Sequence, residues 1–410
     1  MNRAARFGVL FVSVVIFCYA GLGHVLGRTQ DDRAYKSLTV YSEVLQKIQQ
    51  DYVDEPNLHL VTTGSLHGLL ESLDPQSGYL TPREYTEYKQ KVAAHPAGET
   101  GLTLSKRFGY IIVVSVLPDS PADKVGLRSG DILEEVAGFT TRDMSVGQAV
   151  NFLHGQPGTG VKVGVIRRGK TDPDELDIVR EKLPSEKLVS EKVDPDVLAL
   201  RLPSLNPGRA DEIRARLQEA EKQGIHKVVL DLRECGRGPV SEAIAVAKLF
   251  IPAGTLSTLK GQTISTEVYS ADPGKVIWHG PVSILIDPTT SGAAEVLASA
   301  FEANHRGDLV GERTFGLASE QKVITLEDGA ALFLTVGNYY NSDGKSILSE
   351  GVAPTEVVAA SADDDSDGAD DGSDSADAQK QPAVPRPLSP EDQIFQKALQ
   401  LLKTPQKKAA

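Results

Sequence analysis

Cysteine is nearly absent from this sequence, which contains only Cys18 and Cys235. Cys18 lies in an apolar N-terminal segment, so Cys235 is the one thiol in the rest of the chain. An intramolecular disulfide and a thiolate zinc cluster are therefore excluded there. For the same reason, the cysteine count does not identify the compartment in which the protein works.

Positively charged residues are fewer than negatively charged ones. The chain has 43 Lys and Arg against 56 Asp and Glu, which gives a net charge of −13. This balance argues against nucleic acid as a partner. Residues 361–380 hold eight Asp and one Lys, a net charge of −7, which leaves −6 for the other 390 residues. That mild remainder says little about substrates.

Long hydrophobic runs are few, but one opens the chain. Arg3 and Arg6 precede an apolar run from Phe7 to Leu22. A basic flank before such a run is typical of an export signal or a single membrane anchor. We favour an uncleaved anchor within residues 1–29 over a cleaved signal or a buried core helix. Either export reading places the rest of the chain outside the cytoplasm.

The remaining composition is ordinary for a globular protein, with 40% hydrophobic and 24% charged residues. A length of 410 residues suggests two or three domains. Residues 30–95 are predicted to be helical. Their apolar side chains recur at helical spacing, as at Leu38, Tyr41 and Val44. A further helix is expected at "TPREYTEYKQ", with Thr81 as its N-cap and Pro82 at its first position.

Residues 96–184 read differently. A strand at "YIIVVSVLP" precedes a short helix, a strand, the helix "SVGQAVNFLHG" and a closing strand. Small domains with this order bind peptides by adding a strand at a sheet edge. The loop before the first strand could hold a terminal carboxylate with its backbone N–H groups, or it could be a plain turn. Its residues are Gly101, Leu102, Thr103 and Leu104.

Residues 185–360 alternate strands with helices, which predicts an α/β domain. The strand "HKVVLDLR" runs into the loop Glu234–Val240. The strand "PVSILID" runs into the loop Pro288–Gly292, which precedes a helix over Gly292–Asn304. Because loops at the carboxyl ends of strands carry the site in such folds, these two loops are the candidate site.

The tail has two predicted parts. Residues 361–388 are acidic and polar, which predicts a disordered linker. The aspartates in this segment only faintly imitate a calcium loop, which lacks its final glutamate, so no metal or cofactor is expected. Residues 389–404 predict an amphipathic helix with Ser389 as N-cap and Pro390 after it. This helix must dock on its own chain or on a partner. Its apolar face would be Ile394, Ala398, Leu401 and Leu402.

Six ordered phrases resemble the carboxyl-terminal processing (tail-specific) serine proteases of the bacterial envelope. Among them are "SLDPQSGYL", "DSPADKVGLRSGDILEEVAG", "LDLRE", "LVGERTFG" and "YYNSDGKSILSEGVAP". The resemblance spans Tyr35–Val358 and the final helix. It implies a multidomain α+β fold: a helical N-terminal region, a PDZ domain (a small β-barrel-like sheet with two helices) and an α/β protease core of repeated ββα units. It also implies protein C-termini as substrates and self-association.

The chemistry of that family uses a Ser–Lys dyad, in which a desolvated neutral lysine takes the serine proton. The resemblance places the serine three residues before Glu295 and the lysine directly after "TFG". Gly292 and Leu317 occupy these two positions, whereas Gln321 keeps its place in the motif. The neighbouring Ser291 is a fallback nucleophile, with Lys322 as its candidate base. A shift of one residue at a helix start rotates a side chain by about 100°, which makes Ser291 a poor substitute.

The oxyanion region also departs from the family pattern. The resemblance assigns this region to Arg237, Gly238 and Ala293. Where the family has paired glycines, Gly236 and Gly238 flank Arg237 here. We expect the Arg237 side chain to point to solvent, and binding of a substrate carboxylate is the alternative.

Three functions are compatible with these residues. The favoured one is an envelope pseudoprotease whose PDZ domain binds protein or peptide C-termini and which acts as a scaffold or regulator. The second is an active C-terminal processing serine endopeptidase that uses Ser291. The third is a structural role in a homo-oligomer or in a mixed assembly with active relatives. We expect the protein in the periplasm or cell envelope, held at the inner membrane by its N-terminal segment.

Overall fold

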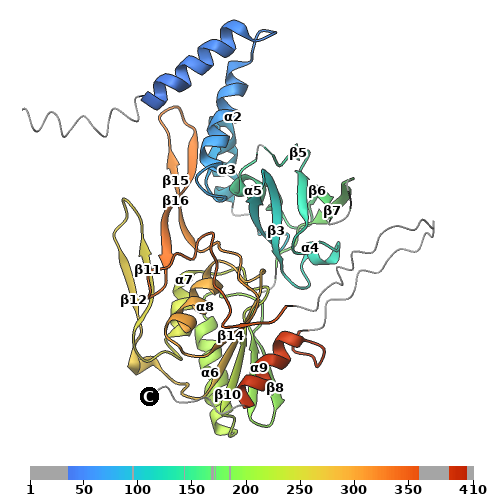
Figure 1. The fold of residues 1–410 in the computed structure, drawn as a ribbon. Coiled ribbons are helices and arrows are strands. Elements are labelled where there is room, and N and C mark those ends of the chain that lie inside the picture. Colours follow the sequence, from blue (N-terminus) through green and yellow to red (C-terminus); the bar gives the residue numbers. More distant parts are fainter. Residues whose placement is uncertain are drawn as a thin grey trace, which may run out of the picture. The chain divides into compact units, whose positions relative to one another are not determined.

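The computed structural model describes residues 36–94, 97–142, 144–167, 170, 172–183, 186–359 and 387–403 (Figure 1). The expected anchor at 1–29 lies outside these residues, as does nearly all of the predicted linker. The chain divides into two compact units, residues 1–66 and 67–410. No described helix is long and apolar enough to cross a membrane.

The first unit is helical over most of its described part. Residues 36–51 form one helix, and α2 (Leu58–Glu71) begins in this unit. The apolar side chains of Leu38, Tyr41 and Val44 follow the predicted helical spacing. Within the described chain they are exposed to 62%, 40% and 51%, so this unit does not bury them itself.

The predicted capped helix lies near the start of the second unit. The N–H of Glu84 donates to Thr81 Oγ1 at 3.3 Å, and the N–H of Thr81 donates to Glu84 Oε2 at 2.8 Å. This reciprocal capping box starts α3 (Pro82–Ala94), with Pro82 at the first position. A short strand, β1 (Gly78–Leu80), precedes it and pairs with β16 (Ala331–Tyr340).

A five-stranded sheet with one added short strand forms the next module. Its helices are α4 (Pro121–Lys124) and α5 (Val146–Leu153), which Ser120 and Ser145 cap as N-cap residues. Strand β2 lies at one edge of the sheet and packs beside α5. The strand order is β2 (Leu102–Arg107), β3 (Tyr110–Val116), β4 (Ile132–Val136), β6 (Gly160–Ile166) and β7 (Asp174–Val179), and β5 (Phe139–Thr140) pairs with β4.

The α/β core is built on a six-stranded sheet. Five of its strands are parallel, and β8 is antiparallel to β9. The order is β17 (Glu356–Val357), β14 (Asp308–Gly311), β13 (Val282–Ile286), β10 (Lys227–Asp231), β9 (Val197–Arg201) and β8 (Val189–Asp194). The helices are α6 (Arg209–Lys222), α7 (Val240–Ala247), α8 (Ala293–Ala303) and α9 (Gln393–Lys403).

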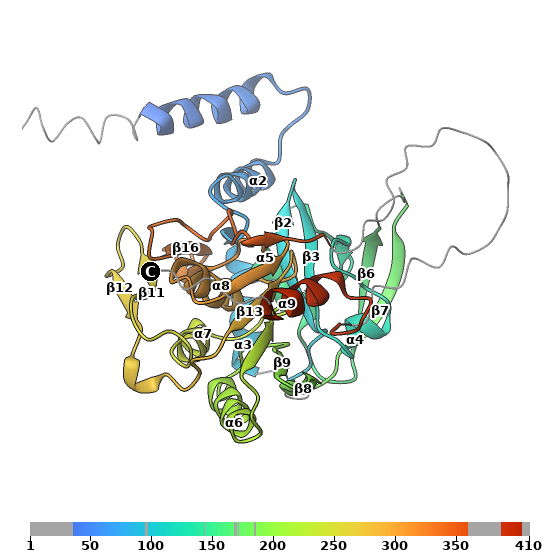
Figure 2. The ribbon, with the colours of Figure 1, turned by 60° about the horizontal axis from the view of Figure 1, so that its bottom comes forward.

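Successive side chains of each strand point to opposite faces of this sheet, and both faces are apolar. Val228 and Leu230 belong to the large core that contains residues of α6, α7 and α8. Val229, between them, belongs to a second cluster with residues of α9. The tail helix therefore covers the face opposite α6–α8, as the two views show (Figures 1 and 2).

A second sheet extends from the core. It contains β11 (Thr255–Lys260), β12 (Glu267–Ser270), β15 (Ser319–Thr325) and β16, and it takes β1 from the N-terminal part of the unit. A 3₁₀ turn at Pro273–Lys275 follows β12. The hairpin of β15 and β16 projects from the body of the core, and its β15 strand is mostly exposed (Figure 1).

The start of the tail helix differs from the prediction. The N–H of Phe395 donates to Asp392 Oδ1 at 3.0 Å, so Asp392 caps α9 and the Ser389 N-cap was wrong. Ser389 lies upstream of the helix, and its buried hydroxyl has no partner among the described residues. Arg233 holds Asp392 in place at the start of α9, because its guanidinium donates to both oxygens of the Asp392 carboxylate. The buried face is Ile394, Phe395, Ala398 and Leu402, and Leu401 is half-buried.

Candidate functional site

The two candidate loops meet at one edge of the core sheet. Strands β10 and β13 are parallel neighbours, and Asp231 lies opposite Leu285 near their carboxyl ends. The N–H of Ser291 donates to the carbonyl of Cys235 at 3.1 Å. The N–H of Glu234 donates to Thr289 Oγ1 at 2.6 Å. The two loops that the sequence analysis chose as the candidate site are therefore joined by direct hydrogen bonds.

Gly292 forms a sharp elbow between the loop after β13 and helix α8. Its φ is 61° and its ψ is −120°, a backbone conformation in which an L-residue is strained. A Cβ built on Gly292 would meet nothing within 4 Å. Strand-to-helix turns with this kind of strain present the nucleophile in several hydrolases. The backbone therefore leaves room for a side chain at position 292, but the glycine there has none.

One buried carboxylate links this elbow to the segment of Leu317. Glu295 is 0% exposed, and its Oε2 accepts from the N–H of Gly292 at 2.8 Å and from the N–H of Leu317 at 2.7 Å. Its Oε1 accepts from Thr314 Oγ1 at 2.6 Å and from the N–H of Gly316 at 2.5 Å. Positions 292 and 317 are therefore neighbours in space. Burial raises the pKa of Glu295 although these four donors oppose the rise.

The side chains that the sequence offered as nucleophile and base do not meet at the elbow. Ser291 is 1% exposed, and its hydroxyl has no partner among the described residues. Lys322 is exposed on β15, opposite Leu334, and does not bond to Ser291. Gln321 is also exposed, and its side-chain NH₂ donates to Thr335 Oγ1 at 2.5 Å and to Ser319 Oγ at 3.4 Å. Burial raises the pKa of Cys235 to about 12, so this thiol stays neutral.

Arg237 occupies a different place from the one expected. Its guanidinium pairs with Glu99, and its Nη1 lies 3.8 Å from Glu186 Oε1. The expectation that it points to solvent was wrong, because these two carboxylates hold a side chain that is 29% exposed. Sequence reasoning missed both acidic partners. They come from distant segments that share no local pattern with the loop.

The other two residues of the predicted oxyanion region are tightly packed. Gly238 has a φ of 114°, and a Cβ there would lie 2.2 Å from the carbonyl oxygen of Leu205. Ala293 is buried at the first position of α8. These contacts hold both loop ends in one conformation, but they add no titratable side chain.

The β2–β3 module touches the core at the same loop. A Cβ on Gly236 would lie 2.8 Å from the hydroxyl oxygens of Ser115 and Ser291 and 2.9 Å from Thr103 Oγ1. Glycine is needed here because three hydroxyl groups surround it. Thr103 belongs to the predicted carboxylate loop, so one end of that loop abuts the candidate site of the core.

The sheet edge at which a peptide strand could add is β2, which packs beside α5, and we call this edge the PDZ groove. Gly101 has a φ of 87°, and a Cβ there would lie 2.3 Å from Ser120 Cβ, so only glycine fits this turn. Leu102 and Leu104 lie on β2, the edge strand of the sheet. Leu102 and Val150 of α5 are half-buried apolar side chains that pack against the module's core. An edge strand beside an apolar helix is the arrangement that accepts an added peptide strand.

Comparison with known proteins agrees with this architecture. Residues 196–358 match peptidase family S41, and residues 112–167 match the PDZ domain. The chain is 28% identical over 344 residues to a carboxy-terminal processing protease, CtpA, of Bacillus subtilis, covering 83% of this chain and 73% of the relative. It is 26% identical to a carboxy-terminal-processing protease of Bartonella bacilliformis, covering 85% and 82%.

A solved structure shows the same fold. The photosystem II D1 C-terminal processing protease aligns with a TM-score of 0.63 and 25% identity, over 78% of this chain and 92% of that chain. The fold and the matched domains therefore define a peptidase-type core that carries a PDZ domain. Over most of its length the chain is similar to carboxyl-terminal processing proteases. The predicted multidomain α+β fold is confirmed, and the family resemblance with it.

Proposed function

We propose that this protein is a pseudoprotease that binds protein or peptide C-termini and does not cleave them. The observation that carries the proposal is the pair Gly292 and Leu317, whose backbone N–H groups share one oxygen of Glu295. These neighbouring positions are those at which the family resemblance places serine and lysine. A glycine supplies no nucleophile and a leucine no base. Substrate binding and oxyanion stabilisation alone would accelerate peptide hydrolysis roughly 10³–10⁴-fold over the reaction in water, which is too little for a practical protease.

The binding half of the proposal rests on the PDZ groove. Its edge strand β2, the Gly101 turn and the apolar pair Leu102 and Val150 favour a peptide with an apolar C-terminal residue. Through this groove the protein would act as a scaffold or as a competitive regulator of active relatives. We place it in the cell envelope, at the inner membrane, because residues 1–29 combine basic residues with an apolar run.

The test uses residues 30–410 and an unfolded protein that ends in an apolar residue. We expect the wild type to bind this protein, to bind its C-terminal amide about tenfold more weakly, and to leave both uncleaved. The double variant Gly292→Ser with Leu317→Lys should cleave it at least about 10² times faster than the wild type. Each single variant should stay inactive because serine and lysine act as a unit.

The controls separate the two halves of the proposal. Val150→Glu, in the groove, should abolish binding without changing the fold of the core. Cleavage by the wild type that Ser291→Ala abolishes would establish the relocated nucleophile and overturn the pseudoprotease. Absence of any binding by the wild type would overturn the peptide-binding role.

A further inference from the structure

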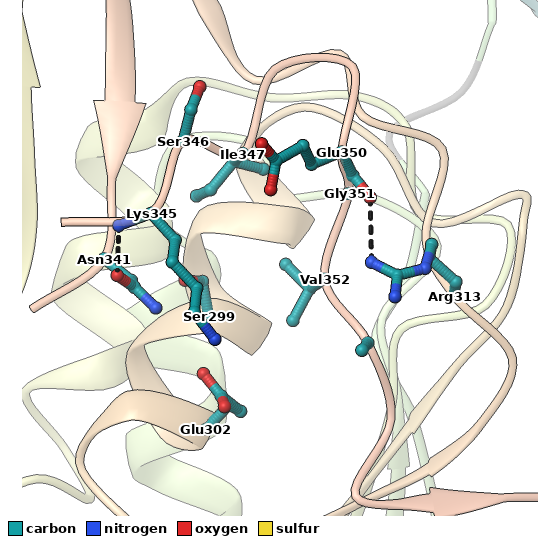
Figure 3. A pocket seen from close by; sticks show the side chains of 11 residues that line it. Ser299, Glu302, Arg313, Asn341, Lys345, Ser346, Ile347, Glu350, Gly351 and Val352 are labelled. Atoms are coloured by element: carbon teal, nitrogen blue, oxygen red, sulfur yellow. Dashed lines mark hydrogen bonds between the residues drawn. The ribbon is translucent and has the colours of Figure 1, made fainter. Parts of the chain in front are cut away.

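A small polar cavity lies on the far part of α8, away from the elbow. It has a volume of about 220 Å³ and is bounded by α8 and by the chain between β16 and β17 (Figure 3). Ser299, on its wall, comes about two helical turns after Gly292. Ile347 and Val352 provide an apolar side, at 2% and 6% exposure. None of the residues that line the cavity belongs to the PDZ domain, and the cavity is joined to the candidate site through the bond from the N–H of Val352 to Thr314 Oγ1.

Two buried polar side chains face this cavity with unused hydrogen-bonding groups. Ser299 is 3% exposed and lines the cavity, and its hydroxyl makes no hydrogen bond with the described residues. Asn341 is 6% exposed, and its Oδ1 accepts from the N–H groups of Asp343 at 3.0 Å and Lys345 at 2.9 Å. Its side-chain NH₂ makes no such bond within the described chain. Neither Ser299 Oγ nor Asn341 Nδ2 is a fully buried atom, so both groups can bond to a molecule that enters the cavity.

Four charged side chains border the cavity, two of each sign. Lys345 and Glu302 lie on one side, and Arg313 projects from the other (Figure 3). Glu350 belongs to the same lining, and its carbonyl accepts from Arg313 Nη1 at 3.0 Å. Within the described residues, none of the four side chains forms an ion pair with an opposite charge within 4.0 Å. Arg313, Lys345 and Glu350 are exposed at the rim and Glu302 is half-buried, so the lining offers two cations and two carboxylates that no opposite charge neutralises.

We propose that this cavity binds a small zwitterion of the amino-acid type, either a free amino acid or a dipeptide. The carboxylate of the ligand pairs with Arg313 or Lys345, and its ammonium pairs with Glu302 or Glu350. The Ser299 hydroxyl and the Asn341 side-chain NH₂ supply hydrogen bonds to the ligand from the wall of the cavity. A purely anionic ligand would meet the two carboxylates, and a purely cationic one the two cations. The volume equals that of about seven water molecules, which suits a ligand of this size.

The test titrates L-alanyl-L-alanine into residues 30–410 by isothermal calorimetry. We expect one site, with binding at least about tenfold weaker for N-acetyl-alanyl-alanine, which lacks the ammonium, and for alanyl-alanine amide, which lacks the carboxylate. Free L-alanine, run in parallel, distinguishes a single amino acid from a dipeptide as the preferred ligand. Ser299→Ala should weaken the binding several-fold.

Charge variants decide whether this cavity is the site. Arg313→Gln with Lys345→Gln should remove the preference for the dipeptide over its amide. Glu302→Gln with Glu350→Gln should remove the preference over the acetylated form. Lys322→Gln, an exposed lysine on β15, is the matched control and should change nothing. The proposal is overturned if no saturable binding occurs, or if binding survives both double variants and is lost in Val150→Glu, which would place the ligand in the PDZ groove.

Discussion

At the scale of single residues, Glu295 organises the candidate site. It stands three positions after Gly292, so its side chain reaches back to the N-terminus of α8 as in a capping box. Its other bonds reach the segment of Gly316 and Leu317, which follows a different strand. A single buried carboxylate therefore sets both the start of the helix and the distance between positions 292 and 317.

Replacing Glu295 should be costly. In Glu295→Gln, an NH₂ group would replace one carboxylate oxygen and face backbone N–H donors that then lack an acceptor. We expect a loss of about 2–4 kcal/mol in the free energy of unfolding, measured by urea denaturation at neutral pH. Glu302→Gln, on the same helix, should cost less than about 0.5 kcal/mol. Equal losses in both variants would contradict the role assigned to Glu295.

At the scale of elements, a buried ion-pair network ties the start of the tail helix to the core, and Lys397 and Lys403 form further ion pairs with Glu356 and Asp194. Arg233, directly after β10, donates to Asp392 Oδ2 at 2.7 Å and to Asp231 Oδ2 at 2.8 Å. Asp392 and Asp231 are 5% and 0% exposed. Because Asp392 also caps α9, the network joins the helix start to the loop that leads into the candidate site.

Acid should release this helix. Burial alone would raise the pKa of Asp392, but the ion pair with Arg233 and two backbone N–H bonds outweigh burial and hold the pKa below its ordinary value. An unfolded aspartate titrates near pH 4. The stabilisation is thus complete above about pH 4 and is lost as the pH falls through the lower folded value.

Methyl NMR signals of Ile394 and Leu402, followed from pH 6 to pH 2.5, would report the undocking of α9. Asp392→Asn should lose this acid-dependent step and should weaken docking at pH 7 by about 1–3 kcal/mol. An unchanged acid midpoint in the variant would assign the transition to other carboxylates.

At the scale of the whole second unit, the PDZ domain and the core meet through few but specific contacts. Arg237 of the core loop pairs with Glu99 at the start of the PDZ domain. The guanidinium of Arg107, at the end of β2, lies 4.3 Å from the ring centre of Phe315. Phe315 belongs to the segment that also contains Leu317, so the peptide-binding module lies against both halves of the candidate site.

A double-mutant cycle measures this contact. We expect Arg237→Gln and Glu99→Gln to show a coupling energy of about 0.5–1 kcal/mol in urea unfolding, since both side chains are about a third exposed. The exposed pair Arg83 and Glu87 is the control, with a coupling of about 0.3–0.5 kcal/mol that salt removes. Strictly additive effects at Arg237 and Glu99 would mean that the ion pair does not hold the PDZ domain to the core.

The sequence by itself determined the local features of this protein. The N-cap Thr81, the helix that starts near Ser145 and the loop at Gly101 could be predicted because each depends on a few adjacent residues. The alternation of strands and helices likewise predicted the α/β core and both site loops. Family phrases with fixed spacing identified positions 292 and 317 as a pair before their contact was known.

Only the tertiary structure decided which distant groups meet. Arg233 and Asp392 are 159 residues apart, and Arg237 and Glu99 are 138 apart. Long-range pairs of this kind overrode the local predictions of a Ser389 cap and a solvent-exposed Arg237. The cavity beside Ser299 is likewise formed by a helix and a later loop that share no sequence pattern. Local patterns record what neighbours along the chain prefer, whereas a charge takes whichever opposite charge the fold brings within reach.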